Sequence, residues 1–438
     1  MQSMLNYSSE CPDYCFCHIF DRTWITATPW LTATKIGKFS YDYMFWSCEK
    51  LTSISNLPAK KLGESCYHAM FSKCEQLTAI PNLPATELEQ FCYHSMFYGC
   101  TNLISAKNVK IKATVCPSSA CNNMFTGCSG LQEPLELAFE QIDSDGCYQM
   151  FFNCHNLKYA PQMNLRSVSS FGLQNAFYNC YSLSSGFGEL NLTDEVIPEK
   201  AFYCCYYNCS SLIENIPTVL PNTQLSTSCF AYMFNGCSAL SSAPELPATK
   251  LGNKCYSSLF NGCTSLTKAP ELPATELKFE CYKNMFKGCT SLTQAPVLRA
   301  TTLTSGCYYQ MFYDCHNLNY MKVHFTEWTT GATENWVTNV GKNLTSVGVF
   351  KCPQELSQEF STNNIPTQPA NWNVETDWSI PLTFTAVEKN TQVRFNWSSA
   401  LETDLSTFVF RTKLEEQQEF TEWKTYNRNK KIILQNIR

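Results

Sequence analysis

The chain repeats itself about every 26 residues, and this period limits its fold more than any other feature of the sequence. One cysteine recurs in eleven units at separations of 26 to 29 residues, and it serves as the marker of each unit. The marker cysteines are Cys48, Cys74, Cys100, Cys128, Cys154, Cys180, Cys209, Cys237, Cys263, Cys289 and Cys315. An earlier, degenerate unit contains Ile25, Thr26 and Pro29. A unit of this size cannot bury its own apolar face, so neighbouring units must stack into a repeat solenoid.

Apolar residues recur at fixed offsets from the marker. Leucine follows it by three residues in all eleven units, phenylalanine precedes it by three in ten, and methionine precedes it by four in eight. A second cysteine lies seven or eight residues before the marker in eight units. We expect these positions to form the core of the stack. The predicted core includes Cys74, Leu77, Cys100, Leu103, Cys237, Leu240, Cys263, Leu266, Cys289, Leu292, Cys315 and Leu318.

The spacing also predicts local structure within a unit. Residues four and eight apart lie on one face of a helix, so we expect a short helical segment before the marker. The residue just before the marker is glycine in five units and asparagine or aspartate in four, and these types accept a positive φ. The Leu-Thr-x-Ala/Ile-Pro run after the marker predicts a short strand that ends at proline. The predicted fold is an α/β, right-handed solenoid of helical turns with a ladder of short parallel strands on one side.

The units resemble the BspA-like class of leucine-rich repeats, found in cell-surface and secreted proteins of bacteria and some protozoa. The resemblance rests on the runs at 285–296 and 272–275 and on the Cys-Tyr pair that opens the units. It covers roughly residues 39–320, and longer units at 107–116 and 187–205 depart from it. It implies a non-enzymatic adhesion or recognition protein that binds a protein or a surface glycan at the cell surface or outside the cell.

The resemblance continues beyond the repeats. Asn335-Trp336-Val337, Gly348-Val349-Phe350, Ile365-Pro366 and Asn371-Trp372 are similar to the segment that closes such solenoids in Bacteroidales-type proteins. Alternating apolar and polar residues at 381–386 and 393–397 predict antiparallel strands. We therefore expect an N-terminal cap with the degenerate repeat (1–38), a solenoid of about eleven units (39–320), a C-terminal cap (321–375) and a small antiparallel β-rich module (376–438).

Charge and hydropathy argue against several classes of protein. The net charge is −5 and only 16% of residues are charged, so we expect no nucleic-acid binding. No apolar run reaches the ~18–20 residues of a transmembrane segment. Residues 1–20 contain no basic region followed by an apolar stretch, so no export signal is visible. This observation leaves open a virion component, such as a bacteriophage fibre or receptor-binding protein, and an intracellular scaffold. The sequence does not indicate an oligomeric state.

Most of the 26 cysteines follow the repeat, which predicts buried structural thiols. The in-register pairs are seven or eight residues apart and no CxxC occurs, so we expect no metal site. Seven cysteines outside the register are better disulfide candidates, although we expect thiols there as well: Cys11, Cys15, Cys17, Cys116, Cys204, Cys205 and Cys352. His68 and His94 share one position in adjacent units and are interpreted as a surface pair. Phosphate-loop, GxSxG and HExxH motifs are missing, so no catalytic residue and no cofactor is predicted.

Tyrosines supply the candidate contacts with a ligand. Tyr203, Tyr206 and Tyr207 crowd into an irregular unit, and tyrosine is favoured in binding surfaces because its rigid ring carries a polar tip. Five other tyrosines directly follow the first cysteine of their units, and their regularity predicts a half-buried structural ladder. These five are Tyr67, Tyr93, Tyr256, Tyr282 and Tyr308.

Overall fold

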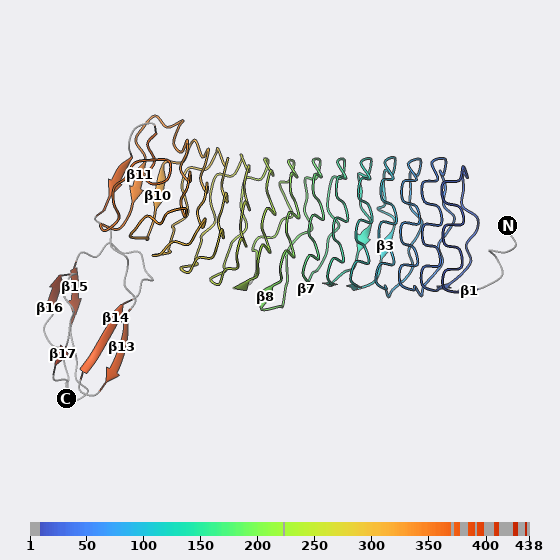
Figure 1. Ribbon diagram of the computed structural model, residues 1–438, viewed down its shortest axis with the longest axis horizontal. Coiled ribbons are helices and arrows are strands. Elements are labelled where there is room, and N and C mark those ends of the chain that lie inside the picture. Colours follow the sequence, from blue (N-terminus) through green and yellow to red (C-terminus); the bar gives the residue numbers. More distant parts are fainter. Residues whose placement is uncertain are drawn as a thin grey trace.

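The computed structural model describes residues 9–221, 224–368 and 372–376, together with the backbone of five strands farther along the chain. The repeats form a rod of stacked coils that runs from the N-terminal end to the strands β10 and β11 (Figure 1). Side chains of successive coils meet in one continuous apolar core. The predicted solenoid with parallel strands is therefore present, and its right-handed sense stays a prediction.

The segment before each marker cysteine is not helical, which corrects the sequence prediction. No α-helix occurs in the part of the chain that the structure describes, and hence none that could cross a membrane. Instead, successive backbone N–H groups donate alternately to a carbonyl oxygen of the same coil and to one of the next coil. The Met70 N–H donates to the Tyr67 carbonyl oxygen at 3.2 Å, whereas the Phe71 N–H donates to the Met96 oxygen of the next coil at 2.9 Å. A left-handed φ recurs at every fourth residue, as at Ala69 with φ 48°.

This chain of tight turns has a period of four residues, which explains why a helical spacing identified the inward-facing positions. Cys66, Met70 and Cys74 occupy equivalent points of successive turns, and all three are fully buried. The twelve predicted core residues are also fully buried: Cys74, Leu77, Cys100, Leu103, Cys237, Leu240, Cys263, Leu266, Cys289, Leu292, Cys315 and Leu318. Because every second N–H in these turns crosses to a neighbour, an isolated coil would leave those groups unpaired. The coils therefore depend on one another.

Short parallel strands join successive coils at three positions along the repeat. Before the turns, the pairs are β1 (Glu10–Cys11) with β2 (Lys35–Ile36), β4 (Val115–Cys116) with β6 (Gln141–Ile142), β6 with β7 (Ser167–Val168), and β8 (Val196–Ile197) with β9 (Gln224–Leu225). Later in the unit, β3 (Lys110–Ile111) pairs with β5 (Glu136–Leu137). The strand expected just after the marker forms as single parallel bridges, such as Ala79 with Ser105 and Ser105 with Glu133.

Each marker thiol donates a hydrogen bond to a backbone carbonyl group of the preceding coil. The Cys74 Sγ lies 3.0 Å from the Phe45 oxygen, and the contact recurs in all eleven units, ending with Cys315 Sγ at 3.0 Å from the Phe286 oxygen. The Phe45 oxygen also accepts the Cys48 N–H at 3.3 Å, so the thiol supplies its second donor. A free cysteine suits this position because it is small, apolar and still able to donate a hydrogen bond.

The degenerate first unit forms a complete coil. Its Phe20 ring stacks on Phe45 with 5.4 Å between the ring centroids. Thr23 takes the place of the marker cysteine, and its hydroxyl lies 3.5 Å from the Cys48 Sγ. The apolar column of the repeat therefore begins in this coil.

One disulfide corrects the expectation of free thiols throughout. Cys11 and Cys15 are bonded to each other in the first coil. The other 24 cysteines are free, and Cys17 is the one among them that is not buried. Of the seven cysteines outside the register, the two that form the disulfide therefore lie where the stack begins.

Beyond the regular units, β10 (Tyr320–Lys322), β11 (Val349–Lys351) and β12 (Asn373–Glu375) form a parallel three-stranded sheet. Trp336 is fully buried and Trp372 is 2% exposed, so aromatic side chains fill this end of the core. The segment extends the parallel stack with one coil of 29 residues and one of 24, and its role as a C-terminal cap stays a prediction.

Five strands are described in the last part of the chain. β13 (Phe384–Lys389) pairs antiparallel with β14 (Gln392–Trp397), and β14 pairs antiparallel with β17 (Leu434–Gln435). β15 (Thr407–Phe410) pairs antiparallel with β16 (Lys424–Asn427). The other residues of 377–438 lie outside the described residues, so the β-rich module and the proposed domain boundaries stay predictions.

Candidate binding surface

The regular tyrosine ladder belongs to the core. Each of its five tyrosines exposes 2% or less of its surface, which is deeper than the half-buried ladder that the sequence predicted: Tyr67, Tyr93, Tyr256, Tyr282 and Tyr308. Their rings stack on those of neighbouring coils, with centroids about 6 Å apart. Burial raises the pKa of each phenol well above its usual value, so all five stay neutral.

Tyr206 is also a core residue, which corrects its assignment as a ligand contact. It is fully buried and stacks between Phe177 at 5.4 Å and Phe234 at 5.7 Å, in the column that phenylalanine fills in the other ten marked units. Its hydroxyl accepts the Phe187 N–H at 2.9 Å. Tyr203 differs, because it stays half-buried at the surface.

Tyr207 belongs to a row of half-buried rings two residues before the marker. Phe152 stacks on Tyr178 at 4.9 Å, and Tyr178 stacks on Tyr207 at 4.4 Å with 1° between the ring planes. One residue after the marker, His155 stacks on Tyr181 at 5.1 Å. Tyr181 is 43% exposed. We call these five residues the aromatic corner.

Three asparagines hold the backbone beneath the aromatic corner. Asn153, Asn179 and Asn208 directly precede their markers and adopt φ values of 58°, 59° and 57°. The Asn179 Nδ2 donates to the Asn153 Oδ1 at 3.0 Å, and the Asn208 Nδ2 donates to the Asn179 Oδ1 at 3.0 Å. The sequence predicted the positive φ but not this ladder, and its signal is three asparagines in consecutive units. The ladder fixes the register of the adjoining rings.

The row of rings before the markers and the Tyr181 ring after the marker influence each other electrostatically. Burial raises the pKa of Tyr178 above its usual value, and the nearby Tyr207 and Tyr181 hydroxyls contribute to the shift. Tyr178 is therefore a neutral phenol at physiological pH, which can donate or accept a hydrogen bond. Its chemistry suits recognition of polar groups.

A shallow hollow of about 440 Å³ shares a coil with the aromatic corner. Lys110, Glu136 and Gln162 line it, and the 38% exposed Tyr159 lies at its side. The Lys110 Nζ lies 3.2 Å from the Glu136 Oε2, so the lysine charge is paired. The hollow thus places polar groups beside exposed aromatic surface.

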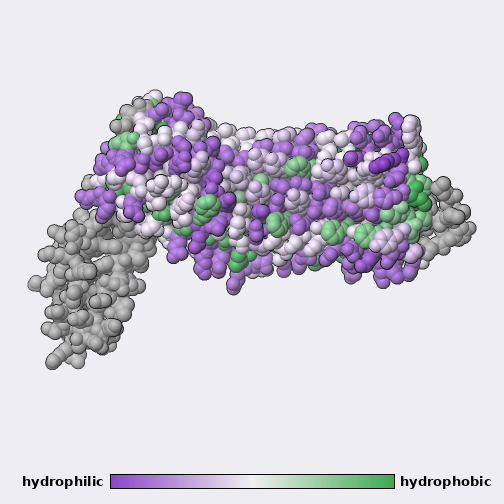
Figure 2. All heavy atoms as spheres, in the orientation of Figure 1, coloured by the Kyte–Doolittle hydropathy of each residue, from purple (hydrophilic) through white to green (hydrophobic). Residues whose placement is uncertain are grey.

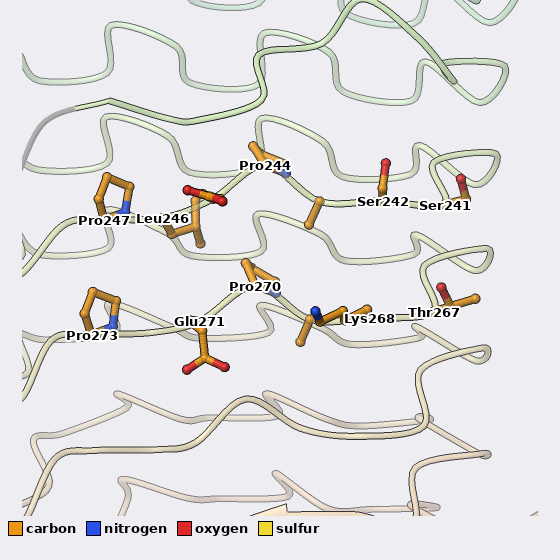
Figure 3. Close-up of a pocket in the computed structure, with 13 residues that line it drawn as sticks. Ser241, Ser242, Pro244, Leu246, Pro247, Thr267, Lys268, Pro270, Glu271 and Pro273 are labelled. Carbon is orange, nitrogen blue, oxygen red and sulfur yellow. The ribbon is translucent and has the colours of Figure 1, made fainter. Parts of the chain in front are cut away.

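A second hollow of about 600 Å³ lies between two regular coils (Figure 3). Its walls are prolines that lie in register, Pro244 and Pro247 in one coil and Pro270 and Pro273 in the next. Neither hollow has a cysteine or histidine among its lining residues, so neither contains the nucleophile and base of a Cys/His catalytic site.

Comparison with protein families places the repeats. A model of the BspA type leucine rich repeat region matches in six copies over residues 9–134 and 205–335, which is 257 of the 438 residues. The chain belongs to the BspA-type leucine-rich-repeat family. The comparison with curated proteins gives no match. In this chain, the recurring Cys, Phe and Leu residues of the repeat form the buried core.

Seven solved protein chains match the BspA-type chain. One of them, described as "Crystal structure of TLR13-ssRNA13 complex", is 12% identical with a TM-score of 0.27. The match covers 78% of this chain and 50% of that one, so the chain spans half the length of that protein. A TM-score this low carries no argument about function.

The coils between the two matched parts of the chain carry most of the aromatic corner. Residues 135–204 lie outside the family match, yet they keep the buried core, as Leu157 and Leu183 show. Their outer positions bear Phe152, Tyr178 and Tyr181. These coils therefore retain the packing of the repeat while their surface differs from it.

Proposed function

We propose that this BspA-type chain is a non-enzymatic recognition protein that binds a protein or a surface glycan along the side of its solenoid. The observation that supports this most directly is the aromatic corner, because its rings lie partly exposed across three coils whose core does not need them. Figure 2 shows that the drawn side of the rod is mostly hydrophilic, with some apolar residues among the polar ones. Contiguous aromatic surface of this kind is enriched in binding sites.

The geometry favours contacts through ring edges and hydroxyl groups. Phe152, Tyr178 and Tyr207 cover one another's faces by stacking. What they offer to a ligand is a row of edges and two phenol groups, and rigid tyrosines of this type bind at low entropic cost. The hollow that shares a coil with the corner is lined by the Lys110–Glu136 ion pair and by Gln162, whose amide donates to the Gly186 carbonyl oxygen. It offers polar groups to a ligand that extends along the same coil.

A recognition role without catalysis agrees with the state of the thiols. All free cysteines except Cys17 are buried, and burial raises the pKa of the Cys263 thiol well above the usual value. The hydrogen bond with Cys74 lowers the pKa of the Cys48 thiol, but this thiol is fully buried. A nucleophilic cysteine needs an exposed thiol with a lowered pKa. We further propose that nucleic acid is not the ligand, since the net charge is −5 and the two lysines of the first hollow, Lys107 and Lys110, are paired with Glu133 and Glu136.

We propose the cell surface or the extracellular space as the place of action, because the family resemblance implies it. The alternative is a virion component that carries the same repeats. Mass spectrometry of the native source separates them, since the protein would be found either in the envelope and secreted fractions or in purified particles.

The experiment that tests the function is a glycan and matrix-protein binding array on the full chain. The ligand found there is titrated against the variant Tyr181→Ser/Tyr207→Ser and the control Tyr98→Ser. Tyr98 is 38% exposed and stands at the same repeat position as Tyr207, in a coil outside the corner. We expect a loss of about tenfold or more in affinity for the double variant and little change for the control. Equal affinities of the double variant and the wild type would refute the proposed surface.

A further inference from the structure

The first four coils place reactive side chains at one equivalent position. Cys17, Asp42, His68 and His94 are separated by 25, 26 and 26 residues, which is the spacing of the stack. His18 adjoins Cys17, and its ring stacks on Tyr43 of the second coil at 4.8 Å. The solenoid thus gathers a thiol, a carboxylate and imidazoles that are far apart in the sequence.

Three of these groups lie close enough to share one ion. One ligand atom each from Cys17, His18 and Asp42 lies within 4.8 Å of the other two. The Cys17 Sγ is 3.7 Å from the Asp42 Oδ2. Cys17 is partly buried, the Asp42 side chain is 13% exposed and that of His18 is 51% exposed, so an ion can reach the group from solvent.

Neighbouring residues orient two of the three groups. The His18 Nδ1 lies 3.0 Å from the Asp21 Oδ2, which leaves its Nε2 for another partner. The Asp42 Oδ1 lies 2.9 Å from the His68 Nδ1, which leaves its Oδ2 toward Cys17. Histidine ligands to metals commonly bind a carboxylate through their second nitrogen, and ligating carboxylates are themselves hydrogen-bonded.

We propose that Cys17, His18 and Asp42 bind a zinc ion that joins the first coil to the second. Sulfur, imidazole and carboxylate together are a ligand set that zinc accepts, whereas calcium and magnesium prefer oxygen alone. Zinc–sulfur and zinc–oxygen lengths of about 2.3 Å and 2.1 Å at a tetrahedral angle separate the two ligand atoms by about 3.6 Å. The observed 3.7 Å between Cys17 and Asp42 already matches this separation.

The electrostatics of the group favour a cation. The Cys17 Sγ and the Asp42 Oδ2 lie 3.7 Å apart, so a divalent ion between them would be held by a thiolate and a carboxylate together. Binding would release the thiol proton to solvent.

The position of the site gives the ion a structural role. The ion would join the first described coil to the second, across the contact where the Phe20 ring stacks on Phe45. The Cys11–Cys15 disulfide lies in that first coil. Zinc would add a second restraint there, and the sequence concealed it because the ligands come from two units rather than from a CxxC motif.

The test uses the reactivity of Cys17, the free thiol that is not buried. The full chain is freed of metal, and alkylation of Cys17 is followed by peptide mass spectrometry with and without zinc. We expect zinc to slow alkylation tenfold or more. Asp42→Asn should abolish this protection, whereas His316→Gln should keep it, because His316 has a carboxylate neighbour, Asp314, at 3.5 Å but no thiol in a ligand cluster.

Cobalt gives an independent readout that does not depend on alkylation. Cobalt bound to the wild type should show the near-ultraviolet charge-transfer band of a cobalt–thiolate bond, with one ion per folded chain, and Cys17→Ser should lack the band. The proposal is overturned if zinc leaves the alkylation rate unchanged, if Asp42→Asn keeps the protection, or if Cys17→Ser keeps the cobalt band. Circular dichroism of each variant checks that the solenoid remains folded.

Discussion

Truncation of one leucine tests how strongly the coils depend on their neighbours. Leu266 is fully buried, and so are Leu240 and Leu292 in the coils on either side. Leu266→Ala removes three carbon atoms from the core, which costs about 2.4 kcal/mol in transfer free energy at ~0.8 kcal/mol each. The cavity left between two fixed coils adds to this, so we expect a total loss of about 3–4 kcal/mol.

Hydrogen exchange measured by mass spectrometry is the suitable assay, because a repeat stack can open in parts and need not unfold in a two-state manner. A loss of about 3 kcal/mol corresponds to roughly 100-fold faster exchange in the coils of residues 237–292. Peptides around Leu77 should change little. The control is Thr267→Ala, since Thr267 is exposed and adjoins Leu266. A loss below ~0.5 kcal/mol for Leu266→Ala would refute the inward-facing leucine column.

Three further predictions follow from particular residues. Burial and His68 lower the pKa of His94 to about 4, so the unfolded chain binds more protons below pH ~6.5 and stability should fall as the pH drops from about 6.5 to 4. In urea unfolding, His94→Gln should reduce that fall by up to roughly 3 kcal/mol and His155→Gln should not; equal pH profiles would contradict the burial of His94. A thiol assay on chain denatured without reductant should count 24 thiols, and a count near zero would exclude the free-thiol ladder. Asn179→Ala should destabilise by about 1 kcal/mol more than Asn179→Gly, because φ is 59° there and glycine accepts it; equal losses in urea unfolding would show that this backbone imposes no strain.

The sequence predicted the stack and the residues that fill it, but not the conformation that presents them. Cys66, Met70 and Cys74 recur at a spacing of four, which a helix and a chain of four-residue turns share. The spacing of buried residues therefore cannot distinguish a helix from a chain of four-residue turns. The residues with positive φ include Ala69 and Lys73, whose types do not indicate a left-handed backbone.

The candidate surface was predictable in part. Tyr207, a candidate contact from the sequence, lies in the row of rings that the structure brings together, and its contact with a ligand stays a prediction. Tyr206 was misassigned although it occupies the phenylalanine position of the repeat, which is the stronger signal for burial. The stacking of Tyr178 on Tyr207 depends on the register between coils, and a period that varies from 26 to 29 residues does not fix that register.

The histidine pair shows the same limit. His68 and His94 were interpreted as a surface pair, and both are only partly exposed. His94 is buried enough to leave its Nδ1 without a hydrogen-bond partner, while His68 contacts Asp42 of the preceding coil. The side chain that the next coil places beside a given residue depends on how the coils stack. The sequence of a single unit therefore does not predict it.

Removal of one whole repeat tests the central claim that the coils are equivalent modules held by their neighbours. Deletion of residues 264–289 takes out 26 residues and joins Cys263 to Thr290, so the register of the stack is kept. Deletion of the 13 residues 264–276 is the matched control that breaks the register. In hydrogen exchange, we predict unchanged protection of the coils on both sides of the 26-residue deletion and loss of protection around the 13-residue deletion. Equal protection in the two variants, or unfolding of the first, would contradict the stacked-coil account.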